Sequence, residues 1–277
     1  MSISLKDITE ARAKLKGVVL ETPLSHSQSA SDLLGSEVFL KMENQQRTGS
    51  FKIRGSLNKM LSLTEEERAR GVIASSAGNH AQGVAFSAKV LKTKSYVVMP
   101  ETAPLVKVLA TRGYGAEVIQ KGRIYDEAFR HAQELEKQKG LTFIHPYNDP
   151  MIIAGQGTIG LELMESEPDL DSIIVPIGGG GLISGVATAA KAINPNVKVY
   201  GVVSEASPGM MQLFKGESLS VPAGALTIAD GISVKKPSEE ILKNYIKKYV
   251  DDVVAVSDNE IAEAIVFFLE RAKTVVE

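Results

Sequence analysis

Short runs of apolar residues alternate along the chain with longer stretches whose apolar residues recur at helical spacing. The runs are rich in Val, Ile and Tyr and mostly lack polar–apolar alternation, which is typical of strands covered on both faces. They predict strands at Val38–Met42, Val72–Ser75, Ser95–Met99, Ala116–Gln120, Thr142–His145, Ser172–Ile177, Lys198–Val203 and Val253–Val256. The helical spacing predicts helices at Asn79–Leu91, Pro104–Arg112, Tyr125–Lys139, Gly157–Glu165, Leu182–Ala192 and Asn259–Lys273.

Strand–helix alternation of this length predicts an α/β fold with parallel strands and right-handed crossovers. Capping-box pairs at Thr64/Glu67 and Ser257/Glu260 mark two helix starts. Pro146 and Pro150 interrupt the pattern and predict a boundary between two α/β lobes of unequal size, and a second boundary is expected near Thr48–Ser50.

Composition narrows the function classes. The chain has 277 residues, with 31 Lys+Arg against 33 Asp+Glu, and this net charge of −2 provides no basic excess for nucleic acid. It has no cysteine, which excludes disulfides, thiolate metal sites and cysteine nucleophiles, and its four histidines are widely separated. No signal peptide is apparent, and no apolar run approaches the roughly 18 residues that span a bilayer. We therefore expect a cytoplasmic protein with no metal, nucleic-acid or membrane partner.

The first candidate motif is Thr48–Gly55, in which a turn leads into a helix with Ser50 as a candidate N-cap. Lys52 then lies in the first helical turn, where the helix dipole disfavours a cation. A lysine in that setting is a candidate for a lowered pKa and for the amine that attacks a carbonyl carbon. A lone lysine is, however, far more often a solvated surface residue.

Two further motifs join a strand to a helix. Ser75–His80 has small residues that let backbone amides approach an anion, although an ordinary turn capped by Asn79 explains it equally well. Gly178–Gly181 follows a buried strand, and a phosphate at the helix N-terminus accounts for four successive glycines better than a structural role does. This run lacks the Lys-Ser/Thr of a P-loop, which makes nucleoside triphosphate hydrolysis an unfavoured interpretation.

Gly155–Gly160 fits the pattern GxGxxG. The dinucleotide-binding fingerprint needs a preceding buried strand, but the segment 148–154 starts from a loop and is too short. We therefore favour helix–helix packing by small residues over dinucleotide binding.

A lysine, an anion-binding turn and a phosphate-binding loop all occur at strand–helix turns. In a parallel sheet those turns share one edge, where ligands bind. Pyridoxal phosphate is a phosphorylated cofactor that forms a Schiff base with lysine.

These motifs resemble those of the serine/threonine dehydratase family of fold-type II pyridoxal-phosphate enzymes, and most closely the biodegradative (catabolic) threonine dehydratases. The resemblance rests on Thr48–Gly55, Ser76–Ala85, Ile153–Glu162, Val175–Gly185, Ala229–Ile232 and Tyr249–Glu260. It implies two open, twisted, mostly parallel sheets with flanking helices, as in the tryptophan synthase beta-like fold. It also implies a large cofactor-binding domain at 1–52 and 149–277 and a small mobile domain at 53–148.

The resemblance further assigns roles to residues. Lys52 would hold the internal aldimine and take the Cα proton, and Phe51 and Gly231 would flank the cofactor ring. Asn79 would bond the phenolic oxygen of the cofactor. The cofactor phosphate would bind the amides of Gly178, Gly179, Gly180, Gly181 and Leu182, and the substrate carboxylate would bind Ser76, Ala77, Gly78, Asn79 and His80.

The implied reaction is α,β-elimination, which converts L-threonine to 2-oxobutanoate and ammonia and L-serine to pyruvate. The cofactor phosphate would assist loss of the β-hydroxyl. The resemblance also implies a homodimer or homotetramer. It implies AMP as an effector as well, although none of these motifs indicates an AMP-binding site.

Two alternatives stay open. The first is serine racemase or another amino-acid eliminase of the same fold, although related racemases carry a metal-binding glutamate where this chain has Val203. The second is a catalytically impaired remnant that binds pyridoxal phosphate. Its basis is that the family continues past Thr274–Glu277 to a Ser or Cys that bonds the pyridine nitrogen, so weak activity is expected of this chain.

Overall fold

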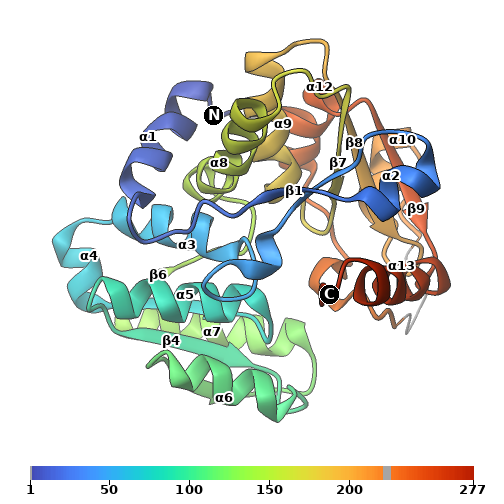
Figure 1. Ribbon diagram of the computed structural model, residues 1–277. Coiled ribbons are helices and arrows are strands. Elements are labelled where there is room, and N and C mark those ends of the chain that lie inside the picture. Colours follow the sequence, from blue (N-terminus) through green and yellow to red (C-terminus); the bar gives the residue numbers. More distant parts are fainter. Residues whose placement is uncertain (1, 221–225) are drawn as a thin grey trace.

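The computed structural model describes residues 2–220 and 226–277 and contains two parallel β-sheets flanked by helices (Figure 1). The strands are β1 (Leu24–His26), β2 (Phe39–Lys41), β3 (Val72–Ser75), β4 (Ser95–Met99), β5 (Glu117–Gln120), β6 (Thr142–Phe143), β7 (Ser172–Pro176), β8 (Lys198–Ser204) and β9 (Asp252–Val256). The α/β class with two open parallel sheets, predicted from the sequence, is confirmed.

One sheet has the strand order β5-β4-β3-β6, with every pair parallel. The helices that follow each other in this part of the chain are α3 (Lys52–Leu61), α4 (Glu65–Arg70), α5 (Asn79–Val90), α6 (Leu105–Gly113) and α7 (Tyr125–Lys139). All residues of β3 are buried, as its unbroken apolar sequence predicts. This sheet occupies the lower left of Figure 1. Helices α5 and α6 pack on one of its faces and α7 packs on the other.

The second sheet has the order β7-β8-β9, again parallel, and lies at the upper right of Figure 1. The remaining helices are α1 (Leu5–Leu15), α2 (Gln28–Leu34), α8 (Pro150–Ser166), α9 (Gly181–Ile193), α10 (Gly209–Lys215), α11 (Glu239–Ile241), α12 (Lys247–Tyr249) and α13 (Asp258–Arg271). Short turns of other helix types are η1 (Glu43–Gln45), η2 (Asp230–Ile232) and η3 (Leu242–Ile246).

The second sheet departs from the expectation that its strands are covered on both faces. Burial alternates along β7, and Ile174 is 69% exposed while Val175 is buried. The buried face packs with α1, α8 and α9 into the largest hydrophobic core of the described residues. The strand expected at Val38–Met42 also differs, because β2 pairs antiparallel with β1, a strand of three residues too short to show a pattern.

Helix α8 begins seven residues earlier than the helical spacing predicts. Asp149 caps it by accepting a hydrogen bond from the Met151 amide at 2.8 Å, and Pro150 occupies the first turn. Residues 152–164 are all buried, so the segment has no polar face and no amphipathic period. The segment 148–154 starts from a loop and contains no strand, as expected, but from Pro150 onward it is helical.

The glycines of α8 bring three helices to backbone contact. A Cβ at Gly155 would overlap the Arg54 carbonyl oxygen of α3, and one at Gly160 would lie 2.7 Å from the Val186 carbonyl oxygen of α9. Gly185 of α9 approaches Ile153 and Gly157 equally closely. The interpretation of the GxGxxG segment as helix–helix packing is confirmed.

This packing predicts the effect of a single methyl group. Gly155→Ala should lower the free energy of unfolding by about 1–3 kcal/mol, because the backbone of α3 must move away. Gly113→Ala is the matched control, since a Cβ at Gly113 in α6 meets nothing within 4 Å. Chemical denaturation measures both variants, and equal stability of the two would contradict the proposed close contact.

Candidate active site

Lys52 is the first residue of α3, as the motif predicts, but the cap differs from the expectation. Phe51 has helical backbone angles (φ −61°, ψ −15°) and is the N-cap, so Ser50 lies one residue too early. The Ser50 hydroxyl is buried and has no hydrogen-bond partner among the described residues. The proposed Ser50 cap was wrong.

The surroundings of Lys52 favour a neutral amine. Its Nζ donates a hydrogen bond to the Pro146 carbonyl oxygen at 3.3 Å and lies 5.2 Å from the centre of the Phe51 ring. Burial lowers the pKa of Lys52 to about 8. A lowered pKa is what the sequence predicts, although burial rather than the helix dipole is the largest cause.

The segment His145–Tyr147 connects Lys52 with the glycine loop. His145 Nδ1 accepts hydrogen bonds from the amides of Tyr147 (3.2 Å) and Asn148 (2.8 Å), and its ring meets the Tyr147 ring edge-on. Burial lowers the pKa of His145 to about 4, so the ring is neutral near pH 7. A Cβ at Gly179 would overlap the Tyr147 ring, which places Tyr147 directly on the loop.

The sequence pattern identifies this segment only as the end of the strand predicted at Thr142–His145 and as a boundary between lobes. The signal that could have identified it is its position at the carboxyl end of a strand of the four-stranded sheet, where binding residues of α/β proteins gather.

The glycine loop joins β7 to α9 and presents a group of free backbone donors. Among residues 2–220 and 226–277, the amides from Gly178 to Leu182 donate to no protein acceptor. Gly180 has φ +88°, a backbone conformation that side chains disfavour, and a Cβ there would lie 2.7 Å from Ile241. Unpaired amides at the start of a helix are a favourable setting for a phosphate.

The remaining predicted residues lie around this loop. A Cβ at Gly178 would lie 2.9 Å from Ile232 Cα, so the Gly231–Ile232 turn adjoins the loop. Asn79 Nδ2 donates to the Glu277 carboxylate at 2.5 Å, and Gly231 also approaches this carboxylate. The structure thus brings Gly178, Gly231 and Asn79 together; sequence analysis did not single out Glu277.

The turn Ser75–His80 leads from β3 into α5, whose N-cap is Gly78 rather than Asn79. Ser76, Ala77, Gly78 and Asn79 are partly exposed, whereas the Ser75 hydroxyl is buried and, within the described part of the chain, lacks a partner. His80 Nε2 donates to the Ile144 carbonyl oxygen at 2.8 Å, and burial lowers the pKa of His80 to about 3. His80 is therefore neutral and already engaged, so its side chain is a poor general acid.

These observations fit a phosphorylated aldehyde. The glycine loop supplies amide donors for the phosphate, and Lys52 supplies an amine that is partly neutral near pH 7. Within the part of the chain that the structure describes, the buried hydroxyls of Thr48, Ser50 and Ser75 have no hydrogen-bond partner, and they lie in the motif that contains Lys52 and in the Ser75–His80 turn.

Comparison with known proteins agrees with this arrangement. Residues 15–277 match the family model described as pyridoxal-phosphate dependent enzyme. The chain belongs to this family. The fold-type II resemblance is confirmed. The cofactor of this family is pyridoxal phosphate.

Individual relatives cover nearly the whole chain. It is 53% identical over 275 residues to the L-threonine ammonia-lyase of Thermotoga maritima, which covers 99% of this chain and 68% of that protein. It is 47% identical to the catabolic L-threonine dehydratase TdcB of Staphylococcus aureus, over 99% of this chain and 80% of that protein. The structure of maize serine racemase matches with a TM-score of 0.95 and 36% identity, over 100% of this chain and 84% of that one.

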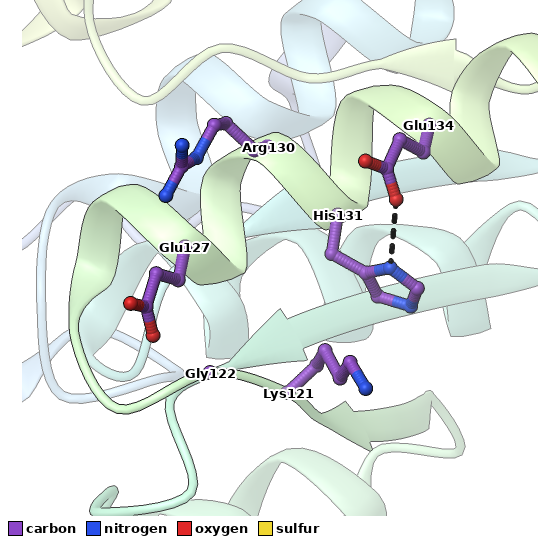
Figure 2. Close-up of a pocket in the computed structure, with 6 residues that line it drawn as sticks. All are labelled: Lys121, Gly122, Glu127, Arg130, His131 and Glu134. Atoms are coloured by element: carbon purple, nitrogen blue, oxygen red, sulfur yellow. Dashed lines mark hydrogen bonds and ion pairs between the residues drawn. The ribbon is translucent and has the colours of Figure 1, made fainter.

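The pyridoxal-phosphate enzyme also has a surface cleft away from these motifs. Figure 2 shows it between the end of β5 and helix α7, where His131 is paired with Glu134. None of the residues predicted for the cofactor or the substrate lines it. In the described ranges no helix is long and apolar enough to cross a bilayer, and no cluster of metal-binding side chains occurs.

The lowered pKa of Lys52 predicts how cofactor attachment depends on pH. The neutral amine attacks the aldehyde, so the rate should rise about tenfold per pH unit below about 8 and level off above it. Stopped-flow absorbance after mixing apoprotein with pyridoxal phosphate measures this rate. The same reaction of Nα-acetyl-lysine corrects for titration of the cofactor, and a rate still rising steeply between about pH 9 and 10 would contradict the assignment.

Proposed function

We propose that this pyridoxal-phosphate enzyme is an L-threonine ammonia-lyase that converts L-threonine to 2-oxobutanoate and ammonia and also accepts L-serine. The observation that carries this proposal is the 53% identity to an L-threonine ammonia-lyase over 99% of the chain. The arrangement of Lys52 beside the segment that contacts the glycine loop supports it.

The bound cofactor supplies an electron-withdrawing ring that stabilises negative charge at the substrate Cα. Lys52 provides the amine that would hold the cofactor and the base that takes the Cα proton onto Nζ. Pro146 orients this amine, because its carbonyl oxygen accepts a hydrogen bond from Nζ. Phe51 packs beside the same nitrogen, with its ring centre 5.2 Å from Nζ.

Two helix starts bind the anions in this proposal. The amides of Gly178–Leu182, at the start of α9, hold the cofactor phosphate, where the helix dipole favours negative charge. The turn Ser76–His80, at the start of α5, holds the substrate carboxylate in the same way. Asn79 donates from its side-chain amide, and in the structure it does so to a carboxylate oxygen.

A second candidate is serine racemase, which the match to the maize enzyme favours at a TM-score of 0.95. Elimination and racemisation both begin with removal of the Cα proton, so the shared site is compatible with either. The higher sequence identity to the ammonia-lyases makes elimination the first choice.

The wider setting is part of the same proposal. We expect a homodimer or homotetramer in the cytoplasm, with AMP as an effector, as the resemblance to the catabolic dehydratases implies. The division into a large domain (1–52 and 149–277) and a small mobile domain (53–148) likewise stays a prediction.

Product analysis tests the proposal. The purified chain, loaded with pyridoxal phosphate, should release keto acid from L-threonine above the background of a protein-free control. Lys52→Ala should reduce this rate to background, because its Nζ both holds the cofactor and takes the proton. D-Serine from L-serine without keto acid would favour the racemase, and cofactor absorbance with neither product would favour the impaired remnant.

A further inference from the structure

A buried cluster of charged side chains joins the helix that begins with Lys52 to helix α8. Arg54 of α3 has a side chain only 1% exposed, and Glu162 of α8 is 6% exposed. Glu43 (14%) and Lys41 (11%) come from the chain that follows β1 and complete the cluster. Its two positive and two negative charges balance.

The guanidinium of Arg54 donates two hydrogen bonds to each of two carboxylates in this cluster. Its Nη2 donates to Glu162 Oε2 at 2.9 Å while Nη1 donates to Oε1 of the same carboxylate. On the other side Nε and Nη2 donate to the two oxygens of Glu43 at 2.9 and 2.7 Å. Burial opposes the charge, yet the hydrogen bonds to Glu43 and Glu162 raise the pKa of Arg54, so it stays protonated.

Such a cluster is a poor way to gain stability alone. Removing charges from water costs several kcal/mol per ion, and apolar side chains of similar volume often give equal or greater stability. What a bidentate guanidinium supplies instead is a fixed direction, because each pair of hydrogen bonds aligns two planar groups. The cluster therefore fixes the orientation of α3 relative to α8 more than it stabilises the contact between the two helices.

That orientation bears on Lys52 directly. Successive helical residues are rotated by about 100°, so Lys52 lies roughly 200° around α3 from Arg54. While Arg54 faces α8, Lys52 extends on the opposite side, where it reaches Pro146. A small rotation of α3 about its axis would move Lys52 Nζ sideways.

Helix α8 also supports the glycine loop, through its contact with α9. Gly157 and Gly160 contact α9 at backbone distance, and α9 starts at Gly181 of the loop. Helix α8 therefore contacts both the helix that carries the amine and the helix that begins at the phosphate-binding loop.

We propose that Arg54, held by Glu162 and Glu43, is a positioning residue that sets where Lys52 Nζ lies relative to the phosphate-binding loop. The proposal rests on the role assigned to Lys52 above and is independent of which amino acid is the substrate. It separates two parts of cofactor binding, because phosphate binding needs the loop alone whereas bond formation needs the amine at the correct distance.

Two ligands distinguish these parts in the apoprotein. Pyridoxal phosphate can bond to Lys52, whereas pyridoxine 5′-phosphate has an alcohol in place of the aldehyde and cannot. Arg54→Lys keeps the charge but loses the paired hydrogen bonds, so it should weaken pyridoxal phosphate binding by about tenfold or more and leave pyridoxine 5′-phosphate within about twofold. Fluorescence titration measures both affinities.

A matched control comes from helix α1, which also pairs an arginine with a glutamate of α8. Arg12 pairs with Glu165 of α8, three residues from Glu162, on a partly exposed surface. Arg12→Lys should leave both affinities unchanged. A loss of preference for pyridoxal phosphate as large as in Arg54→Lys would overturn the proposal.

A second variant guards against simple unfolding. Lys41→Met, Glu43→Leu, Arg54→Met and Glu162→Leu together remove two charges of each sign and replace the whole cluster with apolar side chains, which buried ion pairs often tolerate. This variant should melt near the wild-type temperature and still lose the preference for pyridoxal phosphate. A folded fourfold variant with the wild-type ratio of the two affinities would overturn the proposal.

Lys52→Ala separates this proposal from the role of Lys52 itself. It should bind the two ligands with similar affinity, which defines the ratio without the covalent bond. If Lys52→Ala keeps the wild-type preference, the assigned role of Lys52 fails and the positioning proposal fails with it. If Lys52→Ala loses the preference while Arg54→Lys keeps it, the positioning proposal alone is overturned.

Discussion

The close packing of α8 between α3 and α9 is the constraint on which the rest of the site depends. Gly155 meets the backbone of α3, and Gly160 meets the backbone of α9. Contact at this distance allows little sliding, because protein interiors are packed as densely as organic crystals and a single added carbon must displace backbone. The helices that carry the amine and the phosphate donors are thereby held to one common support.

The electrostatics of the site follow from this packing. Lys52 lies at the start of α3 in a dense environment, and burial rather than a neighbouring charge lowers its pKa. The balanced cluster of Lys41, Glu43, Arg54 and Glu162 lies at the interface with α8 and adds no net charge beside the amine. Near neutral pH the amine can therefore act as a nucleophile or base, while the histidines nearby stay neutral and hold the backbone.

Much of this arrangement could be predicted from sequence, because local patterns encode it. The strands Val72–Ser75 and Ser95–Met99 and the helix Tyr125–Lys139 occur with the predicted bounds. Their residues combine strong β- or helix-forming composition with clear flanking turns.

The features that sequence could not provide depend on contacts between distant segments. Helix α8 is buried on all sides and so lacks the period that marks a helix, which hid its first turns. The contact of Tyr147 with Gly179 and the hydrogen bond of Asn79 with Glu277 join residues far apart in the chain. The Ser50 cap failed because Phe51 already has helical backbone angles, a local choice that propensity does not determine.

The central claim is that Lys52 is the amine that holds pyridoxal phosphate against the glycine loop. Reduction of the loaded protein with borohydride, followed by peptide mapping, tests it most directly, because reduction fixes the cofactor to the nitrogen that bears it. The account predicts one modified peptide, with the pyridoxyl group on Lys52. A stoichiometric label on any other lysine, with Lys52 unmodified, would contradict it.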